Sequence, residues 1–136
     1  SCTGGYLSHL ITSIAGSSTY FNGALVPYNN VFKIAELEVN PSILESKGAV
    51  SEETVIEMAR NVRKKFNADY ALSTSGIAGP GGGTEDKPVG TVWIACDYKD
   101  GTATKKLQLS SGRDLNIKLT SISALNLLRN CLSEKH

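Results

Sequence analysis

The sequence has 136 residues, 40% hydrophobic and 20% charged, a balance typical of one globular domain. Fourteen basic and thirteen acidic side chains give a net charge of +1, without the excess of positive charge on which non-specific nucleic-acid binding depends. No run approaches the ~20 apolar residues of a membrane-spanning helix, and the three cysteines include no close pair. We therefore expect a cytoplasmic protein that binds neither nucleic acid nor a membrane.

The first elements along the chain are predicted to be a helix and a strand. Apolar residues recur at helical spacing after Gly5, and Gly16 can end that helix. Residues 20–26 have the composition of a strand, which Pro27 would end.

Three helices are predicted next. Asn29 or Asn30 can cap a short helix, and residues 41–46 form another short helical turn. Ser51 is expected to cap a longer helix, because acidic residues fill its first turn and basic residues its last. This order of charges complements the helix dipole.

The second half of the chain is predicted to supply most of the sheet. Residues 70–74 and 102–109 have strand character, and the apolar run at 89–96 is typical of a central strand buried on both faces. An Asp-Gly hairpin turn joins the last two strands, and a final helix follows Gly112. We predict a single α/β domain over residues 1–136, with three layers (α/β/α) and a mixed, mostly parallel sheet.

The Gly-rich turn at the start of the sequence follows Ser1 directly. Such turns normally connect two elements of structure. We therefore expect a strand to precede Ser1 in the full-length protein.

Several familiar chemistries are excluded by residue type and spacing. His9 lies ~12 Å from Ser1 along a predicted helix, and His136 ends the sequence, so a Ser-His-Asp triad is not expected. No His, Cys or carboxylate pair has zinc-site spacing, so we expect no metal. Residues 79–87 fail the phosphate-loop pattern, and no G-x-G-x-x-G occurs, which removes the support for nucleoside triphosphate chemistry.

A serine and a lysine remain as candidate reactive groups. Ser1 precedes Gly-Gly and a predicted helix, a position that can expose a hydroxyl beside backbone N–H groups. Lys33 falls in the first turn of another predicted helix, where the dipole lowers an ammonium pKa. A base at neutral pH needs a pKa lowered by ~3 units, or ~4 kcal/mol, from ~10.4. A helix end supplies at most ~2 kcal/mol, so burial must supply the rest.

Each of these residues also has a purely structural interpretation, and residue type and spacing alone do not decide between the structural and the functional one. Ser1 can be a turn residue, Lys33 a solvated surface charge and Tyr28 a packing residue at a strand end. Residues 76–83 can form a mobile turn or an anion-binding nest of N–H groups. Arg113 can bind an acidic group or lie on the surface.

Five short motifs follow one another: Ser1-Cys2-Thr3-Gly4-Gly5; Tyr28-Asn29-Asn30 with Lys33; Gly48-Ala49-Val50-Ser51; the glycine-rich residues 76–83; and Lys87-Pro88-Val89-Gly90-Thr91. Over nearly the whole chain, this series closely resembles the C-terminal domain of the competence/damage-inducible CinA family, which includes stand-alone nicotinamide mononucleotide deamidases. The resemblance implies an amidohydrolase that converts nicotinamide mononucleotide to nicotinic acid mononucleotide and ammonia, without metal or cofactor. In that family Ser1 matches the nucleophile, Lys33 the general base and Tyr28 a tyrosine of the same site.

The resemblance also implies a substrate site and a homodimer. Backbone N–H groups of the turn after Ser1 would hold the oxyanion, while Ser75, the glycine loop and Arg113 would suit the ribose-phosphate half. The expected substrate-binding residues are Thr3, Gly4, Gly5, Asn30, Ser75, Gly76, Gly79, Gly81 and Arg113.

The sequence departs from the family pattern at a few positions. Pro27 replaces a small hydroxyl residue, Ser75 replaces threonine, and the family's glutamate and strand ahead of Ser1 are missing. A free α-amine on Ser1 would offer a second base, as in N-terminal nucleophile enzymes. The alternative function is a non-catalytic module that binds a nucleotide or a protein partner in a competence or recombination pathway.

Overall fold

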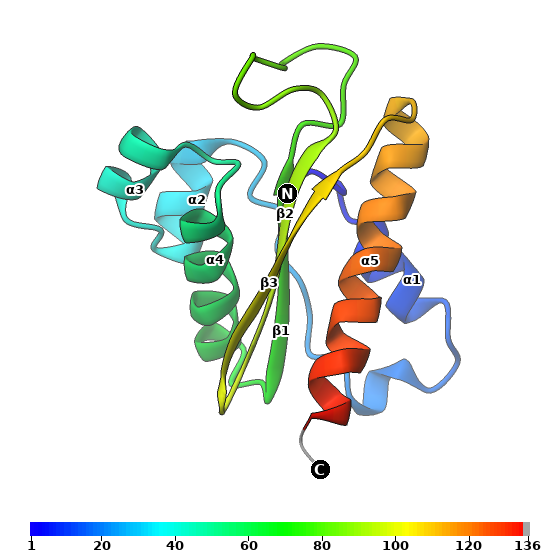
Figure 1. Ribbon diagram of the computed structural model, residues 1–136. Coiled ribbons are helices and arrows are strands. Elements are labelled where there is room, and N and C mark those ends of the chain that lie inside the picture. The colour runs from blue at the N-terminus through cyan, green and yellow to red at the C-terminus, as the bar shows by residue number, and fades with distance from the viewer. Residues whose placement is uncertain (135–136) are drawn as a thin grey trace.

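A three-stranded sheet lies between two helical layers in the computed structural model, which describes residues 1–134 (Figure 1). The helix α4 covers one face, with α2 and α3 beyond it, and α5 and α1 cover the other. The elements in chain order are α1 (Tyr6–Thr12), the 3₁₀ turn η1 (Ser17–Thr19), α2 (Asn30–Leu37), α3 (Pro41–Lys47), α4 (Glu52–Lys65), β1 (Tyr70–Gly76), β2 (Thr91–Tyr98), β3 (Gly101–Gln108) and α5 (Arg113–Ser133). The α/β class and the helices on both faces are as predicted.

The direction of the strands differs from the prediction. The sheet order is β1-β2-β3 and both pairs are antiparallel, with Ile94 opposite Thr74 on one side and Lys105 on the other. The mostly parallel sheet that we predicted is therefore wrong. A parallel pair needs a crossover of a dozen or more residues, usually a helix. In residues 1–134 the three strands follow one another with no helix between them.

The strand predicted at residues 20–26 does not form. The backbone from Phe21 onward is extended, and half-buried Phe21, Gly23 and Leu25 alternate with exposed residues, as in a strand. No sheet hydrogen bond reaches this segment from the described part of the chain. An extended segment becomes a strand only when a neighbour pairs with its N–H and C=O groups.

Local signals in the sequence located the starts of three helices correctly, whereas the first helix, α1, ends at Thr12 and not at Gly16 as predicted. The Asn29 side chain accepts from the Val31 N–H and begins α2, and the Ser51 hydroxyl accepts from the Thr54 N–H and begins α4. The final helix, α5, follows Gly112 as predicted. His136, which we did not expect to take part in a catalytic triad, lies outside the described residues.

The predicted central strand is confirmed. β2 lies between the other two strands, with Val92 and Ile94 packed toward α5 and Ala95 packed against α4. Burial of each large aliphatic side chain contributes about 1.5–3 kcal/mol, so β2 is the main anchor of both helical layers. Within residues 1–134, the helices are too short or too polar to cross a bilayer.

Candidate functional site

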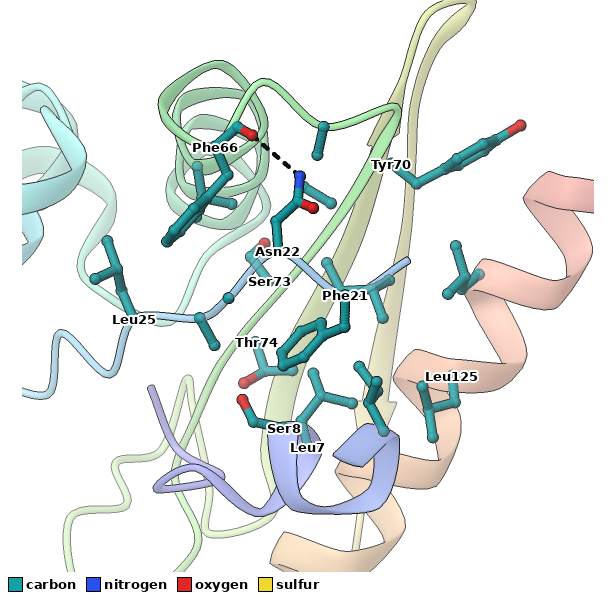
Figure 2. A pocket seen from close by; sticks show the side chains of 18 of the residues that line it. Leu7, Ser8, Phe21, Asn22, Leu25, Phe66, Tyr70, Ser73, Thr74 and Leu125 are labelled. Atoms are coloured by element: carbon teal, nitrogen blue, oxygen red, sulfur yellow. Dashed lines mark hydrogen bonds between the residues drawn. The ribbon is translucent and has the colours of Figure 1, made fainter. Parts of the chain in front are cut away.

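A hollow of about 860 Å³, lined mostly by apolar residues, forms a groove along β1. Figure 2 shows it between the extended segment that carries Phe21 and Leu25 and the strand that carries Ser73 and Thr74, with Leu125 of α5 on the far wall. Among residues 1–134, no lysine, arginine or histidine lines this groove, whereas Asp69 does. Its lining therefore offers no basic side chain for binding an anion.

A second, smaller pocket of about 140 Å³ adjoins the groove at Ser1, near the C-terminal end of β1. Distant parts of the chain meet here: the first residues, the start of α2, the turn before α4, the end of β1 and the start of α5. The lining residues are Ser1, Cys2, Tyr28, Asn30, Lys33, Ala49, Val50, Ser75, Gly76, Ala78 and Arg113. Seven of them are site residues predicted from the sequence, and this pocket is therefore the candidate active site.

Ser1 is held beside β1 by the turn that follows it. Gly4 and Gly5 have φ angles of 59° and 98°, a left-handed backbone that favours glycine and that leads directly into α1. The Ser1 hydroxyl donates to the Thr74 carbonyl at 3.4 Å, and the Ser1 amino nitrogen donates to the same carbonyl at 2.6 Å. The turn thus fixes the serine at the rim where the groove and the pocket meet.

Lys33 is buried, with 2% of its surface exposed, so its interpretation as a solvated surface charge is wrong. Its ammonium donates to the carbonyls of Pro27 and Tyr28 at 3.1 and 3.2 Å. Burial lowers the pKa of Lys33, and the nearby Cys2 thiol opposes that change. The burial that a lysine base requires is therefore present.

Ser1 and Lys33 lie in one pocket, but no hydrogen bond joins their side chains in residues 1–134. Burial lowers the pKa of the Ser1 amino group to about 6; Cys2 opposes this and the charge of Lys33 adds to it. Catalytic hydrogen bonds are often long before a ligand binds.

Arg113, the first residue of α5, lies at the mouth of the pocket. Its guanidinium donates to the Gly79 carbonyl at 2.8 Å and to the Tyr28 hydroxyl at 3.2 Å. Within residues 1–134 it forms no ion pair. Tyr28 is 64% exposed and does not end a strand, so a packing role for it is wrong. An arginine without a carboxylate partner beside a polar pocket is a suitable group for binding an anion.

The other predicted binding residues are distributed around the pocket. Thr3 and Gly5 line the groove, whereas Gly4 and Gly81 line neither hollow. Gly79 is buried and contacts the site through Arg113. Most of the polar residues predicted for the site therefore line the pocket, whereas most of the predicted glycines do not.

Sequence reasoning missed two residues that organise the site. The Thr74 carbonyl, which receives both Ser1 donors, carries no sequence signal because any residue has a carbonyl. Asn116, fully buried in α5, bonds to the glycine loop. Its position one helical turn after Arg113 was the available clue, because a polar residue on a buried helix face needs specific partners.

Comparison with known proteins gave one consistent result. The pattern of the CinA C-terminal domain matches residues 1–132. A CinA-like protein of Cytophaga hutchinsonii is 55% identical over 134 residues, which is 98% of this chain and 32% of that protein. The chain thus spans about a third of the length of the curated relatives it matches.

Solved structures agree with the sequence relatives. The competence/damage inducible protein CihA of Agrobacterium tumefaciens has a TM-score of 0.94 at 36% identity, over 96% of this chain and 80% of that one. The competence damage-inducible protein A (ComA) of Klebsiella pneumoniae also has a TM-score of 0.94, at 32% identity, over 98% of this chain and 83% of that one.

Proposed function

The chain belongs to the CinA C-terminal domain family, and from this premise we propose that it is a metal-independent amidohydrolase acting on nicotinamide mononucleotide. The observation that carries the proposal is the buried Lys33, with a lowered pKa, in the same pocket as the Ser1 hydroxyl. A serine and a lysine form a known nucleophile–base pair when burial keeps the amine neutral.

The hydrogen bonds of Lys33 suit a base. A neutral amine has two N–H bonds and one lone pair, and the carbonyls of Pro27 and Tyr28 take the two N–H bonds. The lone pair then points away from those carbonyls and can accept the proton of the Ser1 hydroxyl. This transfer requires the hydroxyl to turn from the Thr74 carbonyl toward Lys33.

The reaction proceeds in two steps. The Ser1 oxygen attacks the carboxamide carbon, Lys33 takes the hydroxyl proton, and the proton passes to the leaving nitrogen as ammonia departs. Water then attacks the Ser1 ester, giving the free carboxylic acid and restoring the serine hydroxyl. The backbone N–H groups of Thr3 and Gly5 are the candidate donors of this turn for the oxyanion, because the Gly4 N–H donates to the Ser1 carbonyl at 3.1 Å.

The size of the pocket limits what it can hold. Its volume of about 140 Å³ is below the ~300 Å³ of a usual ligand site. We therefore place the carboxamide end of the substrate inside, near Ser1 and Lys33, and the phosphate outside, against Arg113. The guanidinium geometry matches a phosphate.

A free α-amine on Ser1 remains the alternative base, because its pKa is lowered to about 6. The two mechanisms respond differently to a change at the N-terminus. Placing Gly-Ala before Ser1 removes the amine and leaves activity intact if Lys33 is the base. If the Gly-Ala extension abolishes activity and Lys33→Met remains fully active, the α-amine of Ser1 is the base instead of Lys33.

We also propose that the apolar groove holds one extended strand that precedes Ser1 in the full-length protein. The Ser1 nitrogen already bonds to Thr74, and the groove runs from there back toward Tyr70. A strand ending at Ser1 would thus run parallel to β1. It would lie between β1 and residues 21–27, pairing with both.

Ammonia release from nicotinamide mononucleotide, with identification of the acid product, tests the activity. We expect turnover by the chain and near-complete loss in Ser1→Ala. Binding of the nucleotide without any turnover, even after an upstream strand is supplied, would favour the non-catalytic module instead.

A further inference from the structure

Asn116 occupies the first turn of α5 and has 1% of its surface exposed. Its amide nitrogen donates to the carbonyls of Ala78 and Ser111 at 3.0 and 2.9 Å. Its amide oxygen accepts from the Ser111 N–H at 3.2 Å. One side chain thus joins the segment before α5 to the loop after β1.

The contact at Ala78 lies directly beside the contact made by Arg113. The Ala78 carbonyl accepts from Asn116, and the next carbonyl, that of Gly79, accepts from the Arg113 guanidinium at 2.8 Å. A second nitrogen of the same guanidinium donates to the Tyr28 hydroxyl at 3.2 Å. Fixing one carbonyl of a peptide chain restricts where the following carbonyl can point.

A packing role alone does not account for an asparagine here. A buried amide costs about 1–3 kcal/mol unless its hydrogen bonds are made, and an apolar side chain avoids that cost. The bonds of Asn116 connect only backbone groups that flank Arg113 or its acceptor. The residue is therefore suited to limit the freedom of a long, exposed side chain, which otherwise loses entropy when it binds an anion.

We propose that Asn116 is a positioning residue, which aims Arg113 at the phosphate of the substrate. The proposal rests on the proposed function for the identity of the substrate. It assigns Asn116 no contact with substrate: the residue acts through the carbonyls of Ala78 and Gly79 and through the start of α5.

The test compares two substrates with the same carboxamide, nicotinamide mononucleotide and nicotinamide riboside, which lacks the phosphate. Asn116→Asp keeps the shape and the acceptor for Ser111 but loses the donor to Ala78. We expect KM for the mononucleotide to rise ~10-fold, kcat to stay within ~2-fold and the constants for the riboside to stay unchanged. Arg113→Met should show the same loss of phosphate preference, and the double variant should add little.

Asn126→Asp is the matched control, because it makes the same chemical change at an exposed position of α5. Equal losses for both substrates in Asn116→Asp would overturn the proposal and leave Asn116 a structural residue. If Asn116→Asp does not fold, Asn116→Ser answers the same question, since its short side chain cannot span to Ala78.

A binding experiment separates this proposal from the proposed function. Calorimetry with ribose 5-phosphate reports on Arg113 without requiring turnover. We expect binding by the chain and ~10-fold weaker binding by Asn116→Asp. The role of Asn116 is overturned if Asn116→Asp binds ribose 5-phosphate as tightly as the unchanged chain. It is also overturned if the unchanged chain does not bind ribose 5-phosphate. Binding that is weakened in a chain without amidase activity contradicts only the proposed reaction.

Discussion

The two hollows that meet at Ser1 differ in lining as much as in size. The groove, about 860 Å³, is lined mainly by apolar side chains and, within residues 1–134, by no basic side chain. The pocket, about 140 Å³, brings a buried lysine and an arginine beside the serine hydroxyl. The largest apolar hollow is the usual first hypothesis for a binding site. We propose that the smaller hollow is the reaction site here, and that the larger one holds the strand that precedes Ser1.

The largest expected effect is a loss of activity when a residue of the pocket is changed, compared with a residue of the groove. Lys33→Met removes the proposed base and should lower kcat for nicotinamide mononucleotide by ~10²–10⁴-fold. Phe21→Ala changes the groove wall only and should stay within ~3-fold of the unchanged chain. Steady-state ammonia release measures both. A large loss in Phe21→Ala with little change in Lys33→Met would reverse the assignment of the two hollows.

The loop beside the pocket should be more sensitive than its exposed tip. Gly79 has a φ of 91°, and a Cβ there would lie 2.4 Å from a methyl of Val89, so Gly79→Ala should cost about 1–3 kcal/mol of unfolding free energy. It should also raise KM, because the Gly79 carbonyl holds Arg113.

Gly81→Ala is the matched control, since its added Cβ meets nothing within 4 Å. Urea unfolding and substrate kinetics check the pair. Equal effects at the two glycines would contradict a direct link between Gly79 and the pocket.

The lowered pKa of Lys33 should appear in the pH dependence of stability. The folded chain releases this proton at lower pH than the unfolded chain, so the unfolded state binds more protons between the lowered pKa and ~10.4. The contribution of Lys33 to the unfolding free energy should therefore rise with pH in that window, by at most about 1.4 kcal/mol per pH unit, and be flat below it. Lys33→Met should lose this rise. Identical pH profiles from urea unfolding would contradict a buried lysine with a lowered pKa.

The smallest expected effect concerns the groove. Adding seven alternating Thr and Val residues before Ser1 should fill it and raise the unfolding free energy by about 1–2 kcal/mol, through cross-strand pairs with β1. Hydrogen exchange should then slow at residues 70–74. The same extension with Gly and Ser is the control. Equal exchange in both would argue against a strand in the groove.

The features that could be predicted from the sequence are the local ones. Asn29 and Ser51 locate helix starts because a cap depends on hydrogen bonds two or three residues away. The buried character of β2 follows from its nearly continuous apolar run. These features need no knowledge of distant partners.

The features that sequence missed depend on distant partners. Residues 20–26 have strand composition, but a strand also needs a neighbour, and none reaches them from the described part of the chain. The contact between Arg113 and Tyr28 joins residues 85 positions apart, and no local pattern encodes it. Residue type and spacing made Ser1 and Lys33 candidates, and the resemblance then implied their roles. The roles assigned to Ser1, Lys33 and Arg113, and the homodimer, stay predictions.

The most direct test of Ser1 as the nucleophile is the mass of the Ser1 peptide after acid quenching of the chain during turnover of nicotinamide mononucleotide. We predict an ester on Ser1 that adds the mass of the substrate less one ammonia and that is absent in Ser1→Ala. Turnover without any adduct on that peptide, and undiminished in Ser1→Ala, would contradict Ser1 as the nucleophile.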